Sequence, residues 1–245
     1  MTSYALCKPA LLAALLIKEQ LKEPVALFWT VISPVVTYYL IAYAKSPMSN
    51  APTDYLSSTS WFYAFVSSSV AFFGLAFYIV GRRESGFLRS FVYTAHTKMV
   101  FLIGQFIAYS LVSILYCSVF YVLTRHASFD FAEYLIIAGR FYVCFLLFSI
   151  PSLLLTLVPV GFQNTSTLFS MLSLAMLALG IVSIGSLNPA LAILRFFNPM
   201  WWANRIMSVG VAEYAWVVLV VGVLLVLSFW VMVRFLLINP VWSRY

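Results

Sequence analysis

Six continuous apolar stretches constrain this chain more than any other feature of its sequence. They cover residues 25–44, 61–80, 99–123, 134–158, 165–184 and 214–237. A helix that crosses the hydrocarbon core of a bilayer needs roughly 20 such residues, at a rise of about 1.5 Å each. The stretches lack the polar–apolar alternation of membrane β-strands. We therefore expect an all-α integral membrane protein with six transmembrane helices, forming a single transmembrane domain over residues 1–245.

Composition excludes several classes of protein. The chain is 64% apolar and 9% charged, whereas a soluble domain carries about 25% charged residues. Soluble enzymes, secreted disulfide scaffolds and nucleic-acid-binding modules are therefore not expected, and lipid is the expected surrounding. The chain has three cysteines and two histidines, and they are not spaced like the ligands of a metal-binding motif. We therefore predict no metal site.

The distribution of basic residues predicts the orientation in the membrane. Cytoplasmic loops of membrane proteins carry an excess of Lys and Arg. If the N-terminus lies inside, nine basic residues fall on the inner side and four on the outer side, which favours two cytoplasmic termini. The inner nine are Lys8, Lys18, Lys22, Arg82, Arg83, Arg89, Lys98, Arg234 and Arg244, and the outer four are Lys45, Arg125, Arg195 and Arg205.

Arg140 is the remaining basic residue, and it lies inside the fourth apolar stretch. A charge near the middle of a bilayer costs roughly 2.5–3.5 kcal/mol on insertion scales. Two interpretations remain open. The side chain reaches back to the outer interface, or it faces the helix bundle in a packing or substrate-facing role.

Two further segments are expected to be short helices that do not cross the membrane. Residues 9–23 carry leucines at helical spacing and charged residues at their end, which predicts an amphipathic helix in the membrane interface. Residues 185–213 are largely apolar but are interrupted by Asn188-Pro189 and Asn198-Pro199, which break helices. We expect two short re-entrant helices there, with Trp201 and Trp202 at the interface.

The loop between the second and third stretches carries both charge and aromatic residues. Its residues suit a short helix, with Glu84 near the N-terminal end and Phe87 and Leu88 forming an apolar face. A solvated positive loop that only sets topology is the alternative, but it does not require those apolar residues.

Several motifs together resemble one family of membrane proteins. They are Pro24, Phe28-Trp29 and Pro34 at the first stretch, the loop Gly81-Arg-Arg-Glu-Ser-Gly-Phe-Leu-Arg89, Lys98 with Phe101-Leu-Ile-Gly-Gln105, and Phe197-Asn198-Pro199. In this order they look like the membrane subunit of a type-2 ABC (ATP-binding cassette) exporter. The resemblance covers nearly the whole chain, and the loop is its most specific element.

The resemblance implies a permease in the inner or plasma membrane of a cell, working as a homodimer with two separate ATPase subunits that bind ATP and Mg. The chain itself has no G-x-x-x-x-G-K-[ST] motif, so we expect neither a cofactor nor a catalytic residue in it. The loop between spans 2 and 3 would form the cytoplasmic coupling helix. The residues implied in ATPase coupling are Arg82, Arg83, Glu84, Gly86, Phe87, Leu88, Arg89, Lys18 and Glu19.

Residues of the first, second and fifth spans are candidates for the substrate path, because these spans lie near the path in the family. Ordinary helix–helix packing is the alternative explanation for them. The candidates are Tyr38, Tyr39, Phe72, Phe73, Phe77, Asn164, Thr167 and Ser170.

The nature of the cargo is indicated by the acidic residues, all of which fall in loops or at span edges. Ion-coupled transporters keep charged residues inside their spans. An amphiphilic or lipid-like cargo is therefore expected, with membrane lipids as neighbours and no nucleic acid. A non-transport scaffold or assembly subunit, and the membrane component of an importer, remain alternatives.

Overall fold

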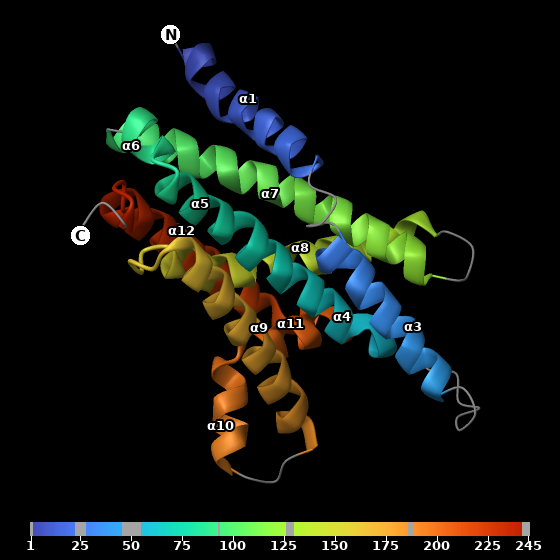
Figure 1. Cartoon of the computed structure of the whole chain (residues 1–245). Coiled ribbons are helices and arrows are strands. Elements are labelled where there is room, and N and C mark those ends of the chain that lie inside the picture. Colours follow the sequence, from blue (N-terminus) through green and yellow to red (C-terminus); the bar gives the residue numbers. More distant parts are fainter. Residues whose placement is uncertain are drawn as a thin grey trace.

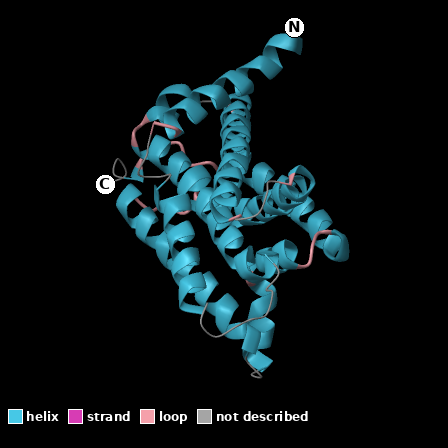
Figure 2. Ribbon diagram, turned by 90° about the vertical axis from the view of Figure 1, so that its right-hand side faces the viewer, coloured by secondary structure: helices cyan, strands magenta, loops and turns pink. Residues whose placement is uncertain are grey.

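Helices make up the regular structure wherever the computed structural model describes the chain, namely residues 2–22, 28–45, 55–92, 94–125, 130–185 and 189–241 (Figures 1 and 2). Five of these helices are long and apolar enough to cross a membrane: Tyr55–Glu84, Ala95–Thr124, Phe131–Leu155, Phe162–Val182 and Ala212–Phe235. Each overlaps one of the expected stretches. The protein is thus an all-helical, multi-pass membrane protein.

The first expected span appears as a shorter apolar helix. A π-helical turn, η1 (Phe28–Ile32), leads into α3 (Ser33–Lys45), and the apolar part, Phe28–Ala44, is shorter than the five long helices. Residues 23–27 lie outside the described residues. A crossing at this position therefore stays a prediction.

The second span is the central helix of the bundle. It is continuous through α4 (Tyr55–Ser69), the π-helical segment η2 (Val70–Ala76) and α5 (Phe77–Glu84). Within its most apolar window 72% of the residues are buried in the protein, against 22% in the last long helix. Small hydroxyl side chains such as Ser67 and Ser68 are fully buried in it. Small residues permit close approach of neighbouring helices in a membrane.

Three other long helices pack against this central one: α7 (Ala95–Thr124), α8 (Phe131–Leu155) and α9 (Phe162–Gly185). The last long helix, α12 (Ala215–Phe235), follows the 3-10 turn η3 (Ala212–Tyr214) and packs on α8 and α7. Thr94 caps α7 by accepting a hydrogen bond from the Thr97 backbone N–H, and Asp130 caps α8 in the same way through Ala132. Such caps satisfy backbone donors that a helix start leaves without partners.

The N-terminal helix α1 (Thr2–Gln20) starts earlier and ends earlier than the expected 9–23. It lies beside α7 (Figure 1). Its leucines divide between two faces: Leu12 packs at Gly104 of α7 and Leu16 is buried, while Leu11 and Leu15 are about two-thirds exposed. The helix is therefore packed against the bundle along one face.

Two short helices follow α9, as the Asn-Pro pairs predict. They are α10 (Pro189–Phe197) and α11 (Pro199–Ser208), while residues 186–188 lie outside the described part. In Figure 1, α10 runs beside α9, whereas α11 packs among α4, α8 and α9. Asn198 fixes this arrangement, because its side chain accepts from the Met200 N–H (3.0 Å) and donates to the Met176 carbonyl (2.7 Å). The depth of these helices in a membrane stays a prediction.

Candidate functional site

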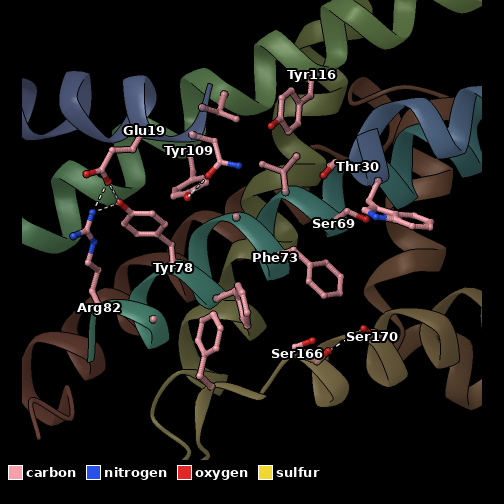
Figure 3. Close-up of a pocket in the computed structure, with 18 of the residues that line it drawn as sticks. Glu19, Thr30, Ser69, Phe73, Tyr78, Arg82, Tyr109, Tyr116, Ser166 and Ser170 are labelled. Carbon is pink, nitrogen blue, oxygen red and sulfur yellow. Dashed lines mark hydrogen bonds and ion pairs between the residues drawn. The ribbon is translucent and has the colours of Figure 1, made fainter. Parts of the chain in front are cut away.

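A cleft of about 1140 Å³ lies along the middle of the central helix (Figure 3). Its walls come from the end of α1, from η1 and the start of α3, from α4 to α5, from α7 and from α9. The π-helical segment η2 forms part of the cleft wall, and in it Gly74 lies against the ring of Tyr109. A Cβ atom at Gly74 would stand 2.6 Å from that ring. Glycine is thus required for the close approach of these two helices.

Aromatic and hydroxyl side chains form most of the cleft lining. Phe77 of α5 and Phe162 of α9 meet with their ring centroids 4.3 Å apart, which closes one side. Hydroxyl groups come from every element that forms the cleft apart from α1 and η2, and Figure 3 labels most of them around Phe73. The hydroxyl residues of the lining are Thr30, Ser33, Ser69, Tyr78, Ser85, Tyr109, Tyr116, Ser166 and Ser170.

A charged cluster closes one end of the cleft, where α1 meets α5. Arg82 forms an ion pair with Glu19, and the Tyr78 hydroxyl donates a hydrogen bond to the same carboxylate. The guanidinium also lies 4.8 Å from the centre of the Tyr78 ring. The hydrogen bond from Tyr78, followed by the bonds and charge of Arg82, lowers the pKa of Glu19. The two charges compensate one another at neutral pH.

Three of the eight expected path residues line this cleft: Phe73, Phe77 and Ser170. Phe72 is fully buried in the core, against Phe148 and Phe169, and is not part of the cleft lining. The other four also lie outside the cleft lining. They are Tyr38, which packs on Phe62, Tyr39, whose hydroxyl donates to the Leu123 carbonyl, and the exposed Asn164 and Thr167.

Sequence reasoning missed the contribution of α7 to the cleft. Tyr109, Val112 and Tyr116 line it, and their i, i+3, i+7 spacing marks one helical face. The spacing shows that the three share a face, but it does not tell whether that face meets protein or lipid. Nothing in the sequence signals the pairing of Gly74 with Tyr109.

The predicted position of Glu84 at the start of a loop helix is wrong. Glu84 is the last residue of α5, because the second span continues as a helix through Gly81 to Glu84. The chain then turns at Ser85 and Gly86, where Gly86 has a φ of 77°. A separate short helix, α6 (Phe87–Phe91), follows.

Arg83 and Glu84 make internal contacts. Arg83 is 2% exposed and donates to the carbonyl groups of Thr156 (2.9 Å) and Val160 (2.5 Å) in the turn between α8 and α9. Glu84 accepts from Arg83 (2.8 Å) and from the backbone N–H of Val241 (3.1 Å). These two residues fasten the end of α5 to its neighbours.

The short helix α6 presents several exposed residues of the loop. Leu88 is fully buried and anchors the helix, while Arg89 and Ser90 are exposed and the Phe91 side chain is 64% exposed. Phe91 stacks beside Phe87 with centroids 4.8 Å apart. Of the expected coupling residues, Arg89, Lys18 and Glu19 are exposed, and Glu19 forms an ion pair with the partly buried Arg82.

Comparison with known proteins gives one informative relative. No protein-family model matches the chain. The chain is 30% identical over 247 residues to Protein McbE of Escherichia coli, and the match covers 95% of this chain and 97% of that protein. The similarity therefore extends over nearly the whole chain.

Proposed function

The chain belongs to the family of Protein McbE, and we propose that it is the permease subunit of an ATP-driven ABC exporter. In this proposal two copies of the chain assemble with two ATPase subunits in the cell membrane, with both termini in the cytoplasm. The ATPase subunits bind ATP and Mg, and the cargo is an amphiphilic or lipid-like molecule.

The observation that carries the proposal is the continuity of the second span. One helix, Tyr55–Glu84, forms a wall of the cleft and ends two residues before α6. Arg83 and Glu84 fix that end to the α8–α9 turn and to Val241. A displacement of α6 by a partner would therefore be transmitted along a rigid element to the cleft. An export permease driven by a separate ATPase needs such a connection.

The lining of the cleft supports an amphiphilic cargo. Its volume of about 1140 Å³ exceeds the roughly 300–1,000 Å³ of ordinary small-molecule pockets. Phenyl rings provide apolar contact area, and the serine, threonine and tyrosine hydroxyls provide hydrogen bonds. Arg82 and Glu19, at one end of the cleft, neutralise each other's charge.

The proposal is tested by purifying the tagged protein from its native membranes in mild detergent and identifying co-purifying chains by mass spectrometry. We expect an ATPase with a P-loop in equal amount. Absence of any such ATPase, with the permease folded, would contradict the proposal and favour a scaffold role.

The coupling surface is tested in the same preparation by the variants Phe91→Ala and Arg89→Ala. We expect either to reduce the retained ATPase several-fold, because both side chains are exposed on α6. Phe131→Ala is the matched control, since Phe131 is 62% exposed at the start of α8. Equal ATPase retention in all three variants would show that α6 is not the docking surface.

A further inference from the structure

A second, smaller cavity surrounds Arg140 on another side of the bundle. Its volume is about 350 Å³, and it lies between the first half of α8 and the turn that follows α11. Apolar residues and backbone form the rest of its lining. They are Leu135, Ile136, Gly139, Val209, Gly210, Val211 and Ala212.

Arg140 reaches across this cavity to α11. Its Nη1 atom donates to the Met207 carbonyl (2.9 Å), one of the last carbonyls of that helix. The guanidinium lies over Gly210, where a Cβ atom would stand 2.9 Å from Nη2. The side chain therefore neither extends freely to the interface nor points into the large cleft. Gly210, with a φ of 118°, leaves the space that the guanidinium occupies.

The charge of Arg140 is not compensated within the part of the chain that the structure describes. No carboxylate there lies within 4.0 Å of its guanidinium, and Glu213, just beyond the cavity lining, makes no ion pair with it. A carbonyl group accepts a hydrogen bond but does not neutralise the cation. In a membrane-spanning helix such a cation is costly unless an anion accompanies it.

The aromatic residues near this cavity are of the types that membrane proteins place at headgroup level. Trp202, Tyr214 and Trp216 gather beside the turn after α11, with the Trp202 ring centroid 5.9 Å from that of Tyr214 and 5.4 Å from that of Trp216. Clusters of Trp and Tyr mark the membrane–water interface. Leu135 and Ile136, in the cavity wall, are more than half exposed and would contact acyl chains.

We propose that Arg140 binds the phosphate of a membrane phospholipid in this cavity. The phosphate supplies the missing negative charge and accepts hydrogen bonds from the guanidinium atoms that do not bind Met207. The parts of the acyl chains next to the headgroup lie against Leu135 and Ile136. This site is separate from the cleft and does not depend on ATP-driven transport.

The test compares two lipid probes that differ only in the phosphorylated headgroup. Native mass spectrometry of the purified protein measures the binding of phosphatidylglycerol and of a diacylglycerol with the same chains. We expect the wild type to bind phosphatidylglycerol about tenfold more tightly, as a charge-assisted hydrogen bond provides. In Arg140→Gln the two lipids should bind equally. A preserved preference in this variant, or none in the wild type, would overturn the proposal.

A second variant keeps the test decisive if Arg140→Gln fails to fold. Gly139 lines the cavity, and a side chain added there meets no atom within 4 Å. Gly139→Leu should therefore fill the cavity, leave the bond to Met207 intact, and abolish the tight binding of phosphatidylglycerol. Gly222→Leu is the matched control, because Gly222 is an equally open glycine on α12. Wild-type binding by Gly139→Leu would refute the site.

Discussion

At the scale of single residues, the most informative side chain is Arg83. The last carbonyl groups of an α-helix have no partner within it, and at the end of α8 Arg83 provides one for Thr156. The carbonyl groups of Val158 and Val160 in the following turn receive hydrogen bonds from the same guanidinium. Its positive charge also complements the negative end of the α8 dipole. The resemblance implies that Arg83 contacts an ATPase, whereas in this structure Arg83 supports the turn between α8 and α9.

Arg83→Ala should therefore destabilise the isolated protein. The variant loses the hydrogen bonds of a charged donor to one buried and two partly buried carbonyl groups, and such bonds are worth about 1.5–3 kcal/mol each. We expect a clearly lower midpoint of thermal unfolding in detergent. Arg89→Ala serves as the comparison, because an exposed residue should change stability by no more than about 0.5 kcal/mol. Equal midpoints for the two variants would refute the supporting role of Arg83.

At the scale of elements, α1 is held on the bundle by two kinds of contact. Its apolar face, with Ala13 and Leu16, packs on Ala108 of α7. At its C-terminal end, Glu19 bonds Arg82 and Tyr78, and Gln20 accepts from the Tyr109 hydroxyl (3.0 Å). Both of these polar contacts lie at the rim of the cleft, so the attachment of α1 and the shape of the cleft are linked.

The attachment of α1 should depend on pH through Glu19. Since the pKa of Glu19 is lowered in the folded protein, its contribution is complete above the ordinary glutamate pKa of about 4.3. The contribution is lost as the pH falls through the lowered value. Hydrogen exchange of the α1 amides should thus be faster in Glu19→Gln than in wild type at pH 7. The two proteins should converge in strong acid.

The control for this experiment is Glu213→Gln, which alters an exposed carboxylate without a described ion pair. It should exchange like the wild type at every pH. If Glu19→Gln and wild type exchange α1 amides at the same rate at pH 7, the ion pair does not hold the helix.

At the scale of the whole molecule, the number of crossings is the main prediction still to be tested. Five long helices and the shorter Phe28–Ala44 are described. Six crossings place both termini on one side of the membrane, and five place them on opposite sides. We expect reporters fused before Met1 and after Tyr245 to give signals from the same side, the cytoplasm. Signals from opposite sides would mean that Phe28–Ala44 does not cross.

The sequence alone predicted the long helices well. The length and apolarity of a stretch decide whether a helix can cross the bilayer, and both can be counted directly in the sequence. The break at Asn198-Pro199 was also visible, since proline removes a backbone donor and blocks the preceding turn. The sequence did not predict how each helix is rotated about its own axis. Phe73 and Phe77 line the cleft while Phe72 lies in the core, yet all three are equally apolar.

The sequence by itself determined that lipid surrounds this chain, where its five long helices run and where its short helices break. Only the tertiary structure decided which faces of those helices meet. In a bilayer both the lipid-facing and the protein-facing sides of a helix are apolar, so hydrophobic periodicity does not report rotation. The burial of Arg83, the contact of Gly74 with Tyr109 and the reach of Arg140 to Met207 depend on packing between segments distant in sequence.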